Sequence, residues 1–215
     1  MHTLYLLGGS PRTAKTTIMA GLTKEKGIAC IAADAVEHGM RNVLTGEPHQ
    51  MLRDIEFAGS AVWKTSITES GERKTFSNKG TESELTLQAI IGMLDYYRRN
   101  QESVAFEGAV FTPKWVKSLK LDGFTIRAAF VGYTNTAHVD NIIDHANENP
   151  HDWIKNWLER NGGDETKIRE WAAKQTEKCI ELKAEAEQLG YPFFDISTQP
   201  FIEYIASVKN YFLEI

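Results

Sequence analysis

The sequence lacks the features that would assign the protein to a membrane, to the cell exterior or to a nucleic acid. No stretch approaches the roughly 18 consecutive apolar residues of a membrane-spanning helix. The two cysteines, Cys30 and Cys179, are not spaced as a metal-binding pair, and two free thiols are typical of a reducing cytoplasm. The net charge of -5 contains no block of like charges, which argues against binding to DNA or RNA. We therefore expect a cytoplasmic protein that binds neither membrane nor nucleic acid.

What the sequence contains is a regular alternation of strand and helix patterns. This alternation predicts an α/β protein with a parallel sheet covered by helices, and 215 residues suit a single domain over 1–215. Short apolar runs predict strands at 3–7, 28–33, 104–111, 125–132 and 193–197.

Helix boundaries are marked by capping residues. The first predicted helix, 15–26, ends at Gly27, and a capping box at 81–84 begins a helix that runs to about Arg99. Further helices are predicted after Thr112-Pro113, over 165–189, and after Pro200. The inner face of the last helix is predicted to carry Phe201, Ile205, Val208 and Phe212.

Two connections are long for simple crossovers between strands. Residues 35–102 join the second and third strands, and 133–192 follow the fourth. Insertions at these places overhang the carboxyl edge of the sheet, where ligands bind. We interpret 35–102 as a substrate-binding insertion and 133–170 as a lid.

The N-terminal stretch "LYLLGGSPRTAKTT" approaches the phosphate-loop pattern G-x-x-x-x-G-K-[ST], with alanine in place of the second glycine. Backbone N–H groups at the start of the following helix would converge on an anion. Lys15 would neutralise the outer phosphates, and Thr16 would offer its hydroxyl to Mg²⁺. The alternative is an ordinary glycine-rich turn. The predicted nucleotide-binding residues are Gly9, Ser10, Pro11, Arg12, Thr13, Ala14, Lys15, Thr16 and Thr17.

Ala14 is the departure from this pattern. If the backbone there has a positive φ, alanine costs on the order of 1 kcal/mol, and its methyl group crowds the phosphates. If φ is negative, alanine is harmless. The sequence leaves both possibilities open.

Two acidic residues stand at or near strand ends that face the phosphate loop. Asp34 follows the second strand, where a carboxylate can bind an acceptor hydroxyl or take its proton. Capping of the following helix is the alternative role for Asp34. Glu107 interrupts an apolar strand, where an ionised group is costly unless partnered, and it is our candidate to hold Mg²⁺ through water.

Arginines supply the positive charge that phosphoryl transfer needs. Arg160 and Arg169 flank the turn "NGGDET" and are candidate catalytic residues of the lid. Arg41 and Arg53 lie in the first insertion and are candidates to bind an anionic group of the substrate. The alternative for all four is a solvated surface position. Arg12 is expected to face the nucleotide or the lid.

Five segments, taken in order, resemble the small P-loop kinases: "LLGGSPRTAKTT", "ADAVEHGMRNVL", "VAFEGAVFTP", "AAFVGYTN" and "YPFFDIS". The similarity is to 2-phosphoglycerate kinase-like, zeta-toxin-like and nucleoside/nucleotide kinase-like proteins. It implies a three-layer fold with strand order 2-3-1-4-5, ATP with Mg²⁺, and transfer of the γ-phosphate to a small molecule. It also implies that Asp34 serves the acceptor, that Glu107 is the acid of the "EG" strand, and that Arg160 and Arg169 belong to the lid.

The leading hypothesis is therefore an ATP-dependent kinase for a small-molecule acceptor. The second is a nucleotide-binding module with a regulatory or scaffolding role and little turnover, which Ala14 favours. A nucleic-acid-directed ATPase is a third, weakened by the acidic balance of the chain. The sequence contains no fingerprint of the acceptor or of the oligomeric state.

Overall fold

The computed structural model describes residues 2–45, 66–67, 73–74, 81–149, 152–160 and 162–214. The first half of the chain contains β1 (His2–Gly9), α1 (Lys15–Lys26), β2 (Ala29–Ala32), α2 (Ala33–Thr45), β3 (Ser66–Ile67), β4 (Arg73–Lys74), α3 (Thr81–Asn100) and β5 (Val104–Gly108). The second half contains α4 (Pro113–Ser118), β6 (Phe124–Gly132), α5 (His138–Glu148), α6 (Trp153–Arg160), α7 (Thr166–Gln188), β7 (Phe193–Asp195), η2 (Ile196–Thr198) and α8 (Phe201–Leu213).

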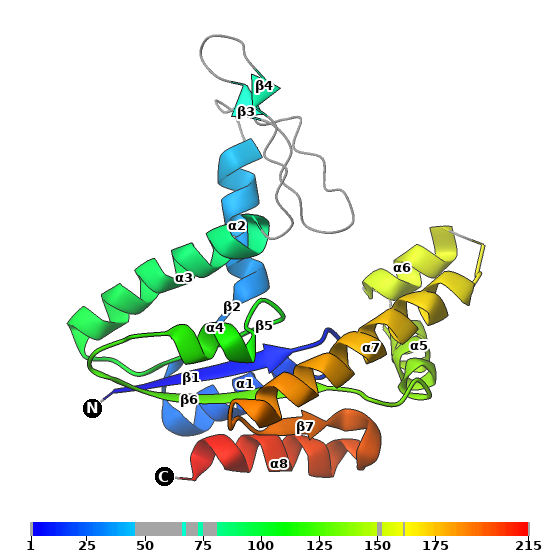
Figure 1. Cartoon of the computed structure of the whole chain (residues 1–215). Coiled ribbons are helices and arrows are strands. Elements are labelled where there is room, and N and C mark those ends of the chain that lie inside the picture. Colours follow the sequence, from blue (N-terminus) through cyan, green and yellow to red (C-terminus); the bar gives the residue numbers. More distant parts are fainter. Residues whose placement is uncertain are drawn as a thin grey trace.

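The central sheet has five parallel strands in the order β2-β5-β1-β6-β7. Counted by their order in the chain, these strands run 2-3-1-4-5, which confirms the expected fold class. Strand β1 lies in the middle of the sheet, and the predicted phosphate loop begins where this strand ends (Figure 1). The short pair β3–β4 is antiparallel and forms a separate two-stranded sheet.

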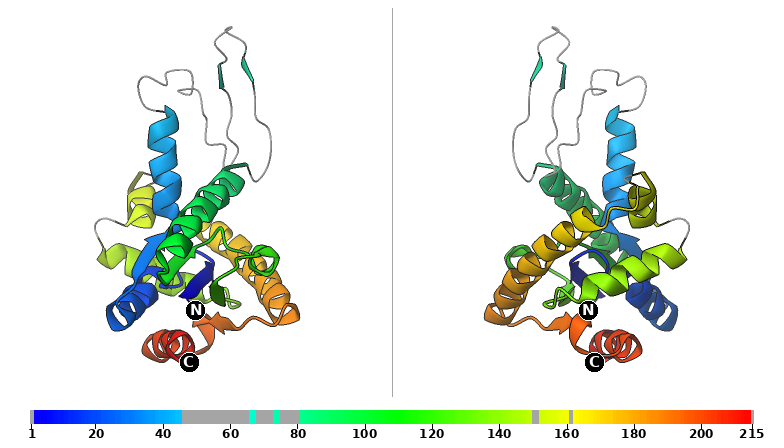
Figure 2. Two further views of the ribbon diagram at one scale, coloured as in Figure 1. Left: turned by 90° about the vertical axis from the view of Figure 1, so that its left-hand side faces the viewer. Right: turned by 90° about the vertical axis from the view of Figure 1, so that its right-hand side faces the viewer.

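The central strands β1 and β5 and the second half of β6 are buried on both faces of the sheet, which explains why they read as continuous apolar runs. Along β1, Tyr5 and Leu7 join one core cluster, and Leu4 and Leu6 join the other. The first cluster packs α1, α5, α6 and α8 against the sheet, and the second packs α3 and α4. Figure 2 shows α3 and α8 on opposite sides of the sheet. The long helix α7 contributes to both clusters.

The helix ends follow the local signals in the sequence. Gly27 closes α1 in a left-handed conformation and donates its N–H to the carbonyl of Thr23. Pro113 begins α4, and the Thr112 hydroxyl accepts a hydrogen bond from the N–H of Trp115. Both of these predictions are confirmed.

The predicted inner face of α8 needs one correction. Val208 and Phe212 are fully buried, as predicted, but Phe201 is 55% exposed and Tyr204 is fully buried in its place. Phe201 and Ile202 at the start of α8 are both exposed, and the core cluster includes this helix only from Tyr204 onward.

The predicted lid region corresponds to α5, α6 and the first turns of α7. These elements lie together beyond the end of β1 (Figure 1). Three parts of the predicted insertion 35–102, at 46–65, 68–72 and 75–80, lie outside the described residues. Within the described part of the chain, no helix is both long and apolar enough to cross a bilayer.

Candidate functional site

The loop between β1 and α1 follows the neighbouring strand β6 before it turns. The N–H of Ser10 donates to the carbonyl of Val131 at 3.0 Å. Gly9 precedes it with φ 133°, and a Cβ at this position would lie 1.9 Å from the Val131 carbonyl oxygen. Only glycine fits this conformation and this close approach.

Two non-glycine residues of the loop adopt left-handed backbone conformations. Arg12 has φ 66°, and Ala14 has φ 56° and ψ 25°. Ala14 therefore has a positive φ, which is the less favourable of the two conformations that the sequence left open. It costs the folded state about 1 kcal/mol or more. Its methyl group does not prevent the loop from adopting this shape.

Helix α1 begins at Lys15, directly after the loop. Ala14 provides no side-chain cap, so the first N–H groups of the helix are positioned to donate to an anion. The Lys15 ammonium donates to the Ser10 carbonyl at 2.7 Å, and the Thr13 hydroxyl donates to the same oxygen at 2.8 Å. Lys15 is buried, and burial lowers the pKa of its ammonium against the opposing charges of Glu107 and Asp34.

Glu107 and Thr16 form the second part of the site. Glu107 lies on β5, opposite Leu7 of β1 and Ala32 of β2, and is only 6% exposed. The Thr16 hydroxyl donates to Glu107 Oε1 at 2.9 Å. Burial raises the pKa of the Glu107 carboxyl, against the opposing effects of this hydrogen bond and of the Lys15 charge.

Asp34 lies in the first turn of α2, one residue after the start of the helix, and is exposed. Its charge raises the pKa values of both Lys15 and Glu107. The fold thus brings Lys15, Thr16, Glu107 and Asp34 into one electrostatic environment at the carboxyl edge of the sheet.

Arg12 points from the loop to the predicted lid. Its guanidinium pairs through both terminal nitrogens with the carboxylate of Asp152, at 2.5 Å for each contact. The side chain of Asp152 is 2% exposed, and it also accepts the N–H of Ile154 at the start of α6. The guanidinium carbon lies 5.3 Å from the ring centroid of Trp153. These contacts fasten the lid region to the phosphate loop.

A second long-range contact reaches the loop from α8. The hydroxyl of Tyr204 donates to the carbonyl oxygen of Thr13 at 2.7 Å, and its ring is fully buried. Sequence reasoning missed both Asp152 and Tyr204. An aspartate that precedes a helix is a recognisable cap signal, but nothing local indicates a partner 140 or 191 residues away.

Asp195 ties together two loops at the same edge of the sheet. It accepts hydrogen bonds from the N–H and hydroxyl of Ser197 and from the hydroxyl of Thr134. Burial raises the pKa of its carboxyl, but these hydrogen bonds outweigh that effect and hold the pKa below its usual range.

The predicted lid arginines differ in their surroundings. Arg169 is 47% exposed, and its guanidinium pairs with Asp140 and Glu165, each at 2.8 Å. Arg160 is exposed at the end of α6. Their catalytic roles remain predictions.

For the remaining predicted site residues, the structure gives at most a position in the fold. Arg41 lies on α2, and Arg53 falls outside the described residues. Thr17 is exposed in the first turn of α1, and Pro11 is half-buried in the loop. Their roles at the nucleotide or the acceptor stay predictions.

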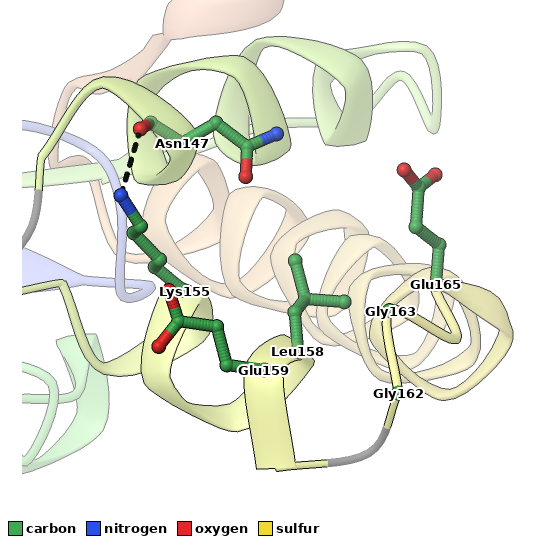
Figure 3. Close-up of a pocket in the computed structure, with 7 residues that line it drawn as sticks. All are labelled: Asn147, Lys155, Leu158, Glu159, Gly162, Gly163 and Glu165. Atoms are coloured by element: carbon green, nitrogen blue, oxygen red, sulfur yellow. Dashed lines mark hydrogen bonds between the residues drawn. The ribbon is translucent and has the colours of Figure 1, made fainter.

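A hollow of about 470 Å³ lies within the predicted lid region and not at the phosphate loop. Figure 3 shows that Asn147, Lys155 and Glu159 line it, together with the turn at Gly162–Gly163. The Lys155 ammonium donates to the Asn147 carbonyl across it at 3.4 Å. None of its lining residues belongs to the predicted nucleotide-binding loop.

The residues present fit a magnesium nucleotide. The uncapped start of α1 and the Lys15 ammonium suit a polyphosphate, and the paired oxygens of Thr16 and Glu107 are of the hard type that Mg²⁺ prefers. Across the described ranges, no group of three or more His, Cys, Asp or Glu side chains could hold a metal by itself.

Comparison with known proteins supports the same fold. No protein-family profile and no curated protein matches the sequence. Among solved structures, shikimate kinase from Bacteroides thetaiotaomicron is 11% identical with a TM-score of 0.52, and the match covers 99% of each chain. A gluconokinase from Sinorhizobium meliloti 1021 is 14% identical with a TM-score of 0.50, over 99% of this chain and 98% of that one.

At these identities the likeness shows the fold alone. The chain has the fold of the small P-loop kinases, and the resemblance seen in its sequence motifs is confirmed at that level.

Proposed function

We propose that the protein is an ATP-dependent phosphotransferase that moves the γ-phosphate of ATP to a small-molecule acceptor. The observation that carries the proposal is the junction of Lys15, Thr16 and Glu107. A buried ammonium and a hydroxyl bonded to a buried carboxylate lie at the uncapped start of α1. The kinases of the same fold described above support the reaction class.

The phosphate loop would bind the polyphosphate through the N–H groups at the start of α1 and through Lys15. For this, the Lys15 ammonium exchanges the Ser10 carbonyl for phosphate oxygens, and nearby Glu107 and Asp34 favour its charged form. Thr16 and Glu107 would hold Mg²⁺, which supplies charge neutralisation between phosphate oxygens when bound.

The exposed carboxylate of Asp34 is the group proposed to orient the acceptor hydroxyl and to receive its proton. It lies in the first turn of α2, directly after β2 and immediately before the predicted insertion 35–102 in the sequence. The lid formed by α5, α6 and the start of α7 would exclude water, so that ATP is not hydrolysed wastefully.

Calorimetric titration with ATP and Mg²⁺, followed by a screen of phosphate acceptors, tests the proposal. We expect ATP binding and transfer to at least one acceptor, both abolished by Lys15→Met. The matched control is Lys24→Met, because Lys24 is an exposed lysine on the same helix α1. Asp34→Asn should retain ATP binding and lose transfer. Equal transfer by Asp34→Asn and the wild type would remove Asp34 from its role as base.

A nucleotide-binding module with little turnover is the second candidate. It is favoured by the left-handed Ala14 and by the Lys15 ammonium, whose hydrogen bond is satisfied within the loop. Tight binding of ATP or ADP without transfer to any acceptor would identify this role.

The proposed compartment is the cytoplasm, because Cys30 and Cys179 are both free thiols. The proposed partner is the small-molecule acceptor alone.

A further inference from the structure

We propose that Tyr204 is a positioning residue of the phosphate loop. The hydrogen bond from its hydroxyl stabilises the left-handed backbone conformation at position 14, which glycine would adopt unaided. The inference rests on the proposed function, because it concerns the loop that would bind the nucleotide. Its basis is one hydrogen bond, from the Tyr204 hydroxyl to the Thr13 carbonyl at 2.7 Å, next to the left-handed Ala14.

The hydrogen bond and the left-handed conformation act on the same peptide group. The Thr13 carbonyl belongs to the peptide that joins Thr13 to Ala14, and the φ of Ala14, 56°, describes how this peptide is turned about the following N–Cα bond. If φ relaxed to the right-handed value near -60°, the peptide would turn by roughly 120° relative to the helix. Its carbonyl would then leave Tyr204. The hydrogen bond therefore opposes the relaxation that alanine prefers.

The same peptide carries a backbone donor of the phosphate loop. In a planar trans peptide the N–H points away from the C=O, so a Thr13 carbonyl turned toward Tyr204 directs the Ala14 N–H away from α8. Backbone N–H groups of such a loop are the donors that hold an anion. Tyr204 thus fixes the direction of one of these donors without touching the ligand.

Packing gives the tyrosine the rigidity that this role requires. The ring of Tyr204 is fully buried in the core cluster that also contains Ile18 of α1 and Val208 of α8. Ala14 itself packs against this cluster. The hydroxyl is therefore held at one place by a close-packed core.

A cycle of two substitutions tests the inference, with the dissociation constant of ATP as the measurement. Tyr204→Phe removes only the hydroxyl, and Ala14→Gly removes the preference against positive φ. With Ala14 present, we expect Tyr204→Phe to weaken ATP binding about fivefold. In the Ala14→Gly background the same change should weaken binding by less than about twofold, because glycine keeps the left-handed conformation unaided.

Tyr211→Phe is the matched control. Tyr211 lies on the same helix, and its hydroxyl donates to the Ala128 carbonyl on β6 at 3.0 Å, away from the phosphate loop. The Tyr211→Phe substitution should leave the ATP affinity unchanged, whether position 14 is alanine or glycine. The inference is overturned if Tyr204→Phe weakens binding equally in both backgrounds, or if Tyr211→Phe weakens it as much.

A second measurement separates this inference from the proposed function. If the wild type binds no nucleoside triphosphate, the proposed function fails, and the cycle is then measured by urea unfolding. A smaller loss of stability from Tyr204→Phe in the Ala14→Gly background supports the positioning role. Additive losses overturn it.

Discussion

The guanidinium of Arg12 in the phosphate loop is paired through two hydrogen bonds with Asp152, which lies 140 residues further along the chain. Asp152 is buried, caps the start of α6, and leads directly into Trp153, over whose ring the same guanidinium lies. A side chain from the loop between β1 and α1 thus anchors the start of α6, in the predicted lid region. The charge of Arg12 is balanced by Asp152, and Lys15 is therefore the cation of this loop that we propose for phosphate binding.

Removing one partner of this pair should destabilise the protein strongly. We expect Asp152→Ala to lower the free energy of unfolding by about 2 to 3 kcal/mol, because it leaves the Arg12 charge without its partner. Asp140→Ala, which removes an exposed partner of Arg169, is the control and should have a much smaller effect. Urea unfolding measures both. In the double variant Arg12→Ala/Asp152→Ala the loss should be smaller than the sum of the single losses, and strict additivity would contradict the pairing.

Glu107→Gln should separate metal use from nucleotide binding. Glutamine can still accept the Thr16 hydrogen bond but carries no charge, so we expect the transfer rate to fall about 100-fold and the Mg²⁺ requirement to rise. ATP affinity measured in EDTA should change little. The control is Glu102→Gln, at an exposed position just before β5. Loss of ATP affinity in EDTA as large as the loss of rate would show that Glu107 supports the loop rather than the metal.

The two lid arginines should contribute unequally. The Arg169 guanidinium is already engaged by Asp140 and Glu165, so Arg169→Ala should change the transfer rate by less than about threefold. Arg160→Ala should lower the rate by about 100-fold or more if Arg160 supplies positive charge over the transferred group. Steady-state kinetics with the identified acceptor decides between them. A larger effect at Arg169 would show that its surface ion pairs open during turnover.

Asp195 should contribute stability that depends on pH. Its carboxyl pKa is depressed in the folded protein, so this contribution is present above the unfolded-state value of about 3.9 and is lost as the pH falls through the lower folded-state value. Asp195→Asn should therefore cost about 1 kcal/mol at pH 7, after allowance for solvent screening, and progressively less below about pH 4. Urea unfolding between pH 3 and pH 7 checks this. A difference that does not change with pH would contradict the assignment.

Much of the fold could be predicted from the sequence because its signals are local. The buried strands are apolar runs, Gly27 and Thr112 mark helix ends, and the alternation of elements specifies a parallel sheet. The prediction for Phe201 is wrong because helical periodicity gives the direction of a side chain but not where the core ends. The extent of the core depends on neighbouring elements, which periodicity does not contain.

The location of the candidate site could be predicted where one motif contains several of its residues, and their roles stay predictions. The phosphate loop specifies Lys15 and Thr16, and a charged residue inside an apolar strand singles out Glu107. The backbone angle at Ala14 could not be predicted, since both signs of φ are open to a loop residue. It depends on contacts from Tyr204, far away in the sequence. The role of Asp152 could not be predicted for the same reason.

The contact between Tyr204 and Thr13 also constrains when the site can form during synthesis. The loop leaves the ribosome well before α8, because the hydroxyl that bonds its Thr13 carbonyl lies 191 residues further along the chain. A nascent chain folding from its N-terminus would carry the whole phosphate-loop motif while Tyr204 is still missing. The nucleotide affinity that we propose would therefore reach its full value only after helix α8 has docked.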